Sequence, residues 1–430
     1  MKFGKIFFWV MGLCFVFLLM PRVEALERSS CVSVGLDVLA SRTEMVKSGL
    51  VNNDIVFDAE DFERSLNVSA LSSVTVTVLP SRADGVLYLG NGEVSVGQTI
   101  SRDNLGYLNF VFASEKIKDS RFSFTSNFGE YEISCKMCLL DSLNHAPTVS
   151  NETKTSTPVG TYQNIAVYGT LSASDVDGDS FIFEIVSQPK NGTLIVEDAS
   201  IGTYCYLPCG GYSGEDSFRY VAIDKYGNYS AAAEIKLQVD VQKNRLVYSD
   251  MKNSIAHVPA ISLTERGIMS ASKVGGKSYF HPNQTISRLD FLVAAMKAIG
   301  YEDAKACVKT VFDDDAEIPE GFKGYVALAQ QKNYVCGKID ENGRLLFSPN
   351  DDITRAEAAV ILSRMISKES VGLHAVFADE EEVPAWARDA LYTLAEFGVI
   401  DSRNGYVDAA GTLTREHTAY MLYNLGLIAE

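Results

Sequence analysis

Two hydrophobic periods divide the chain. Between residues 26 and 241, apolar and polar residues alternate in short runs, as in the segment from Ser73 to Val78, which stops before Pro80. A period of two is typical of strands that bury one face. From residue 242 onward, apolar residues recur at helical spacing, as in Ala358, Ile361, Leu362 and Met365. The pattern therefore predicts an all-β part followed by an all-α part.

The β part contains several short runs separated by turn sequences. Apolar runs flank residues 90–92, 188–192 and 224–228, which are rich in Gly, Asn, Pro and Asp. Such segments predict hairpins, and short strands at this spacing are typical of β-sandwiches. We expect two sandwiches, residues 26–143 and 144–241.

The segment 1–25 has the features of a secretory signal peptide. Two lysines precede an apolar run from Phe7 to Met20, and Pro21 ends it. The run is shorter than the roughly 20 residues needed to cross a bilayer. We expect cleavage after Ala25, export, and no membrane span in the mature chain.

Export makes the cysteines candidates for disulfides, because oxidising compartments permit them. Local spacing suggests two bonds, Cys205–Cys209 and Cys307–Cys336, and leaves Cys31, Cys135 and Cys138 to compete for a third. A zinc site is disfavoured, since only one C-x-x-C pair is present.

The helical part contains an internal repeat. An aromatic-x-Asp motif begins at positions 248, 312 and 377, which are almost evenly spaced. A second motif, an aliphatic residue followed by Ser or Thr and then Arg, occurs at residues 286–288, 353–355 and 413–415. A fixed period of this kind indicates repeated structural units. We expect three, at residues 242–303, 304–371 and 372–430.

The second motif predicts the start of a capped helix in each unit. Thr354 and Glu357 form a capping box, in which each side chain bonds the other residue's backbone N–H. Ser287 with Asp290 is a weaker version, and the third unit has His417 in place of the acid. Each unit should therefore consist of a helix, a loop with a turn, and a capped helix.

The arginine just inside each capped helix is a candidate anion-binding residue. Helix N-termini favour anions through free N–H groups and the macrodipole, and a guanidinium adds a bidentate fork for a carboxylate. The alternative is that each arginine only ties loops together through a salt bridge to the aspartate of an aromatic-x-Asp motif. The arginines are Arg288, Arg355 and Arg415, and the aspartates are Asp250, Asp314 and Asp379.

The three units resemble S-layer homology domains. The resemblance rests on the aromatic-x-Asp starts, the pair Trp386-Ala387, the F-x-P-N turns at 280–283 and 347–350, and the box at 353–357. It implies docking on a secondary cell-wall polysaccharide, or on a peptidoglycan-linked polymer, often through pyruvate ketals whose carboxylate meets the box arginine. By position this role falls on the three arginines and the three aspartates named above, with Trp386 as a candidate for stacking on a sugar. Arg355 is the first candidate, because its box is complete.

Residues 144–241 resemble bacterial cadherin-like or Ig-like repeats, and residues 26–143 resemble a divergent copy. The segments that carry this resemblance are 144–148, 169–179, 189–194 and 212–220. The alternating carboxylates Asp175, Asp177 and Asp179 allow two interpretations, a calcium site or an ordinary Asp-Gly turn.

Composition narrows the functional classes. The chain has 430 residues and a net charge of −17, which argues against a nucleic-acid partner. We find no G-x-S-x-G, H-E-x-x-H or phosphate-loop motif, and we expect no enzymatic activity and no obligatory cofactor. The expected protein is a non-catalytic exported surface protein that its helical units anchor to the bacterial wall. The alternative is a carbohydrate-active exoprotein whose β domains bind or cleave a glycan.

Overall fold

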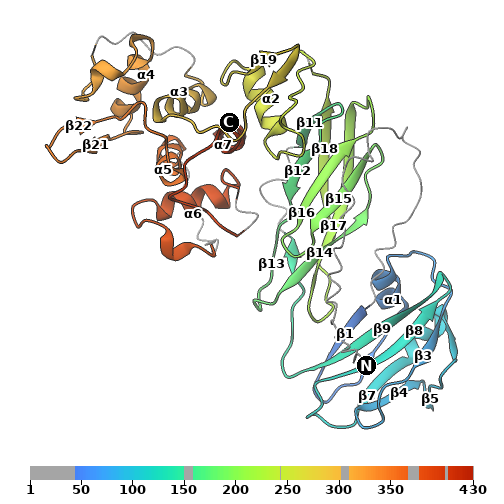
Figure 1. Ribbon diagram of the computed structural model, residues 1–430. Helices are drawn as coiled ribbons and strands as arrows, with labels where there is room; N and C mark the ends of the chain where they lie inside the picture. Colours follow the sequence, from blue (N-terminus) through green and yellow to red (C-terminus); the bar gives the residue numbers. More distant parts are fainter. Residues whose placement is uncertain are drawn as a thin grey trace, which may run out of the picture.

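The computed structural model describes residues 44–149, 158–242, 244–301, 309–366, 377–401 and 405–429 (Figure 1). Strands dominate up to residue 240 and helices dominate afterwards, so the predicted order of β and α parts is confirmed. The proposed signal peptide, Cys31 and Cys307 lie outside the described residues. Among the residues described, no helix is both long and apolar enough to span a membrane.

The first β domain consists of two sheets that share one core. Val76, Phe110 and Phe124 are among the fully buried side chains of that core. One sheet has the order β1-β9-β8-β3-β6, with β1 (Glu44–Leu50), β3 (Ser73–Val78), β6 (Thr99–Ser101), β8 (Asp119–Ser126) and β9 (Gly129–Leu140). The other has the order β2-β7-β4-β5, with β2 (Ile55–Val56), β4 (Gly85–Leu89), β5 (Gly92–Glu93) and β7 (Leu108–Phe112). Helix α1 (Ala59–Leu66) and the 3-10 segment η2 (Arg102–Tyr107) complete the domain.

The second β domain has a four-stranded and a three-stranded sheet around a core of aromatic residues that includes Tyr206, Phe218 and Tyr220. The first sheet is β11-β18-β17-β14, with β11 (Val159–Tyr162), β14 (Phe181–Ser187), β17 (Gly214–Asp224) and β18 (Ala233–Asp240). The second is β12-β16-β15, with β12 (Val167–Thr170), β15 (Gly192–Asp198) and β16 (Thr203–Pro208). A two-stranded pair joins β10 (Thr148–Val149) to β13 (Ala173–Ser174).

Two of the three predicted hairpins are correct. Strands β4 and β5 pair across residues 90–92, and β17 pairs with β18. The hairpin at residues 188–192 is wrong, because β14 pairs with β17 while β15 pairs with β16 in the other sheet. The loop instead crosses between the sheets, where Asp216 accepts hydrogen bonds from the backbone of Lys190 and Asn191 at 2.9 and 2.8 Å.

The predicted disulfides are also wrong. Cys205 and Cys336 are free thiols, whereas Cys209 is disulfide-bonded. Cys205 lies in β16 and Cys209 directly follows that strand, so about four extended residues, roughly 13 Å, separate them. A disulfide needs Cα atoms within about 7 Å, which excludes bonding between these two. Cys336 instead accepts a hydrogen bond from the Arg364 guanidinium, with Nη1 and Sγ 3.2 Å apart.

The helical part has six helices in the described residues, two in each of the three units. They are α2 (His257–Glu265) and α3 (Arg288–Ala298), α4 (Glu320–Gln331) and α5 (Arg355–Met365), and α6 (Arg388–Glu396) and α7 (Arg415–Ala429). Small hairpins and 3-10 segments lie beside the helices: β19 (Ser272–Val274) with β20 (Lys277–Tyr279), β21 (Lys338–Ile339) with β22 (Leu345–Leu346), η3 (Asp315–Glu317) and η4 (Glu380–Glu382). The predicted starts of the capped helices are confirmed, and the box of Thr354 and Glu357 forms in full.

The three units are joined in a closed order. The first N–H of each capped helix donates to a backbone carbonyl in the turn of the next unit, and the third unit returns to the first. These bonds run from Arg288 to Asp351 at 2.8 Å, from Arg355 to Gly411 at 3.0 Å, and from Arg415 to Gln284 at 2.8 Å. Helix packing follows the same order, because α4 contacts α3, α6 contacts α5 and α2 contacts α7. These bonds and helix contacts thus link each unit to the next and the third unit back to the first.

The second β domain packs directly on this ring of helices (Figure 1). Buried residues of both parts belong to one continuous hydrophobic core. Tyr162 of β11 lies beside Ser262 of α2 and Tyr423 of α7, and burial in this interface raises the pKa of Tyr162 to about 12. The α2–α7 side of the ring is therefore covered by the β domain.

Candidate functional site

The aspartates of the three aromatic-x-Asp motifs hold turns in place. Each carboxylate accepts hydrogen bonds from two consecutive backbone N–H groups further along its own unit. The pairs are Asp250 with Phe280 (2.9 Å) and His281 (2.7 Å), Asp314 with Phe347 (2.9 Å) and Ser348 (2.7 Å), and Asp379 with Val407 (3.0 Å) and Asp408 (2.7 Å). The second donor residue has a left-handed backbone in every unit, with φ of 59°, 59° and 46°.

The partners of these three carboxylates are therefore backbone N–H groups and not the box arginines. In the described part of the chain, no ion pair joins Arg288, Arg355 or Arg415 to any of them, so the salt-bridge alternative is wrong. The aspartates were also predicted to contact the wall polymer. Their carboxylate oxygens are already engaged by the turns, which favours an indirect role.

The starts of the capped helices are not free to bind an anion. The first two N–H groups of α3, α5 and α7 donate to carbonyls of the next unit. The third is bonded by the cap side chain, as in the bond from Glu357 N to Thr354 Oγ1 at 3.3 Å. The expectation of exposed helix N–H groups is therefore wrong, and an anion here must be bound by side chains.

Arg288 is buried and has an acidic partner. It is 6% exposed, its Nη1 lies 3.6 Å from Glu357 Oε2, and its guanidinium lies over the ring of Phe347 at 5.5 Å. Glu357 also pairs with Lys338 at 2.5 Å. Arg288 is thus neutralised and closed to solvent, which argues against ligand contact.

Arg415 is engaged by the first unit. Its Nε donates to the carbonyl of Phe280 at 2.8 Å and its Nη2 to the carbonyl of Ser270 at 2.5 Å. The guanidinium also lies over the Phe280 ring at 4.6 Å. Arg415 therefore ties the third unit to the first.

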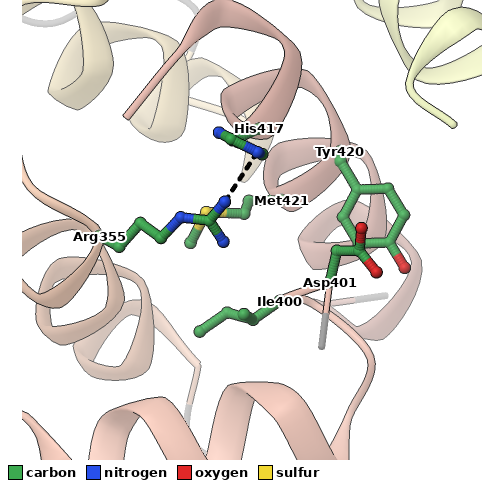
Figure 2. Close-up of a pocket in the computed structure, with 6 residues that line it drawn as sticks. All are labelled: Arg355, Ile400, Asp401, His417, Tyr420 and Met421. Atoms are coloured by element: carbon green, nitrogen blue, oxygen red, sulfur yellow. Dashed lines mark hydrogen bonds between the residues drawn. The ribbon is translucent and has the colours of Figure 1, made fainter. Parts of the chain in front are cut away.

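Arg355 differs from both. Its Nη2 lies 2.7 Å from Nε2 of His417, and its Nε, like that of Arg288, is buried without a hydrogen-bond partner. The side chain borders a small pocket, the Arg355 pocket, of about 10 Å³, which holds about one water molecule. Figure 2 shows the guanidinium pointing into this pocket; the other residues around it are Ile400, Asp401, His417, Tyr420 and Met421. Burial lowers the pKa of the Arg355 guanidinium, which reflects the cost of holding this charge away from water.

The tautomer of His417 follows from its partners. A guanidinium only donates, so His417 Nε2 accepts and its proton lies on Nδ1, which is 3.0 Å from Thr414 Oγ1. Burial and the adjacent Arg355 both lower the pKa of His417. The imidazole is therefore neutral at pH 7.

One position explains why the three arginines differ. Each box arginine faces the third helical residue of the next unit's capped helix. Glu357 lies 3.6 Å from Arg288 and the neutral His417 lies 2.7 Å from Arg355, whereas Asp290 acts on Arg415 only electrostatically, from beyond ion-pair distance. In the described part of the chain, no carboxylate lies within ion-pair distance of Arg355, and Asp401 and Asp408 act on it only from further away. Among the described residues, Arg355 and Arg415 both lack an adjacent carboxylate, but Arg415 donates to two backbone carbonyls, whereas Arg355 bonds the imidazole of His417.

Trp386 is 62% exposed at the start of α6 and does not line the Arg355 pocket. Its exposure suits the predicted stacking on a sugar, which stays a prediction. Ile400, Asp401, Tyr420 and Met421 also line the pocket but belong to no motif recognised in the sequence. The sequence signal for this pocket was the incomplete capping box of the third unit, in which His417 stands in place of an acidic residue.

The three carboxylates of the proposed calcium loop have separate partners. Asp175 accepts from the backbone N–H groups of Asp177 and Asp179, Asp177 from His145, and Asp179 pairs with Lys225 at 2.6 Å. Among the residues described, no three His, Cys, Asp or Glu side chains converge as a metal site would require. The bonds to Asp175 Oδ1 form the predicted turn, and calcium binding at this loop stays a prediction.

Comparisons with known proteins agree with both resemblances. The family model described as S-layer homology domain matches residues 311–359, which include Arg355, and the model described as bacterial Ig domain matches residues 144–237. The chain therefore carries an S-layer homology domain and a bacterial Ig domain, and the former supports attachment to the cell surface.

Individual relatives match only parts of the chain. An amylopullulanase from Thermoanaerobacterium thermosulfurigenes is 25% identical over 185 residues, which cover 41% of this chain and 9% of that protein. Fibronectin(III)-like modules of Clostridium thermocellum CbhA are similar at 13% identity, covering 46% of this chain and 90% of theirs, with a TM-score of 0.21. Drosophila N-cadherin EC1-3 matches at 13% identity over 47% of this chain and 64% of its own, also with a TM-score of 0.21.

Proposed function

We propose that this protein is a non-catalytic surface protein, exported and held non-covalently on the bacterial cell wall by its helical units. The ligand is an acidic secondary cell-wall polysaccharide, and the two β domains are displayed for spacing or adhesion. The observation that carries the proposal is the buried guanidinium of Arg355, which lacks an adjacent carboxylate and lies within the matched S-layer homology domain.

A carboxylate on a sugar is the ligand that this geometry supports best. The unpartnered Nε–H lies on the edge that Nη2 shares, and Nη1 and Nη2 form the other edge, so the guanidinium keeps N–H donors for the oxygens of a carboxylate. The pocket admits little more than the tip of a ligand, so the anion should be a small group projecting from a larger polymer. A pyruvate ketal has this form.

The proposal also covers the domain types of the helical part and of the two β domains. We interpret the helical part as a triplet of S-layer homology domains, because its three units share the same aspartate-held turns and the same helix-start bonds. We interpret each β domain as an Ig-like sandwich, since its sheets enclose a single core. Both interpretations extend beyond the residues that the family models match.

Co-sedimentation of the full chain with purified wall sacculi tests the proposal. R355A should weaken binding by about 10- to 100-fold, since hydrogen bonds to charged groups contribute about 1.5–3 kcal/mol. R344A is a charge-matched control, because Arg344 is an exposed arginine of the same unit that pairs locally with Asp340. Acid treatment of the sacculi, which strips the wall polymer, should abolish binding.

Equal sedimentation of R355A and the unaltered chain would refute the Arg355 site. Release of soluble sugar from wall glycans by the full chain would instead favour the carbohydrate-active alternative. The relative named an amylopullulanase gives that alternative little support, since the match covers 9% of it.

A further inference from the structure

The residue opposite Arg355 is the position where this chain departs from its own repeat. Units one and two have Asp290 and Glu357 at the third residue of the capped helix, and unit three has His417. A carboxylate at that position neutralises the arginine it faces, as Glu357 does for Arg288 at 3.6 Å. The imidazole instead accepts one hydrogen bond from Arg355 and leaves its charge in place.

His417 also holds the guanidinium in one orientation. Its Nε2 accepts from Arg355 Nη2 at 2.7 Å while its Nδ1 is fixed by Thr414 Oγ1 at 3.0 Å. This pair of bonds directs one edge of the guanidinium toward His417. The unpartnered Nε–H and the N–H groups that do not face His417 are left for a ligand.

We propose that His417 is a specificity-determining residue that keeps the Arg355 pocket selective for anions and makes anion binding stronger in acid. The inference rests on the proposed function, because the anion is the carboxylate of the wall polymer. In the free protein, the imidazole stays neutral because a proton on Nε2 would replace the bond to Arg355 with repulsion between two cations. A carboxylate bound to the remaining N–H groups of Arg355 would offset that repulsion, so ligand and proton bind cooperatively.

The surroundings of His417 determine the sign of this linkage. Arg355 on α5 is the cation that opposes protonation, and burial opposes it further. Asp401 after α6, Asp408 in the third turn and Glu416 on the same helix favour it from a greater distance. An incoming carboxylate would be closer than these groups. At a separation of about 5 Å, the attraction between protonated His417 and the bound carboxylate outweighs the loss of the neutral hydrogen bond from Arg355 to His417. The affinity for the carboxylate therefore rises as the pH falls.

Sedimentation of the full chain with sacculi at pH 7.5 and pH 5.5 tests the inference. We expect binding to be about three- to tenfold tighter at pH 5.5, within the limit of tenfold per pH unit for one linked proton. H417Q keeps a neutral acceptor that does not titrate, so this difference should disappear. The comparison also controls for titration of the polymer itself.

H417E tests selectivity directly. It restores the acidic residue of the repeat and completes the capping box with Thr414, so it should fold at least as well as the unaltered chain. The new carboxylate should pair with Arg355 and reduce binding about as much as R355A does. NMR of His417 in the full chain should show the Nδ1–H tautomer and a pKa below the ordinary value.

The outcomes separate the two proposals. If the unaltered chain does not bind sacculi, the proposed function fails, and if R355A binds as well as the unaltered chain, the Arg355 site is refuted. If R355A weakens binding but the unaltered chain shows no acid enhancement, or H417Q retains it, the His417 inference is overturned and the anchoring function stands. Unchanged binding by H417E would also overturn the inference.

Discussion

Replacing Asp314 with alanine should markedly lower the free energy of unfolding of the helical ring, although the residue is only partly buried. The carboxylate accepts from Phe347 N at 2.9 Å and Ser348 N at 2.7 Å. Each charge-assisted bond contributes about 1.5–3 kcal/mol, and water replaces part of it at the more accessible Ser348. The same bonds hold Ser348 at φ 59°, a left-handed conformation that costs about 1 kcal/mol. We therefore expect D314A to lower the free energy of unfolding by about 3 kcal/mol.

Urea unfolding followed by the far-ultraviolet helical signal measures this change. D314N retains one acceptor oxygen without the charge and should lose about half as much. E341A removes an exposed carboxylate from the β21–β22 turn and serves as the charge-matched control. An ordinary surface substitution changes the free energy of unfolding by less than about 0.5 kcal/mol. If D314A stays within that range but abolishes sedimentation with sacculi, Asp314 is a ligand residue and our account of the turn is wrong.

Two further predictions concern buried groups. Burial lowers the pKa of His257 to about 4, so its neutral form stabilises the fold; stability should be complete above about pH 6.5 and fall by about 3 kcal/mol between pH 6.5 and pH 4. Melting curves across that range should show the loss, and H257Q should reduce it; an identical pH profile for H257Q would contradict the assignment. Among the four free cysteines described, the exposed Cys336 should react first with maleimide, because burial raises the pKa values of Cys135, Cys138 and Cys205. Peptide mass mapping after a short exposure checks this order, and prompt labelling of Cys135 would refute it.

Local signals in the sequence predicted local structure well. The Ser or Thr caps placed the starts of α3, α5 and α7 correctly, because capping depends on residues three positions apart. The hairpin at residues 188–192 failed, because a turn sequence does not reveal which sheet receives the following strand. The bond between Cys205 and Cys209 failed for a related reason, since proximity in sequence along an extended strand is not proximity in space.

The hydrogen-bond and charge partners of the candidate site residues are distant in sequence and could not be predicted. Three arginines were predicted at corresponding positions, with Arg355 first, but the different surroundings of Arg288, Arg355 and Arg415 come from residues of other units, far away along the chain. The helix-start N–H groups were expected to be free, and the carbonyls that accept from them have no side-chain signature. Only the closed order of the units brings these groups together.

The closed order of the helical units also sets their number. In an open solenoid, a repeat can be inserted or deleted at small cost, because each repeat contacts only its neighbours and the ends are capped. Here the last unit supplies the partner of the first, so deleting one unit would leave both a helix start and a turn unpaired. An inserted fourth unit would have to break an existing junction before it could join. Growth of this protein by repeat duplication should therefore proceed by whole rings, or by added β domains, rather than by single helical units.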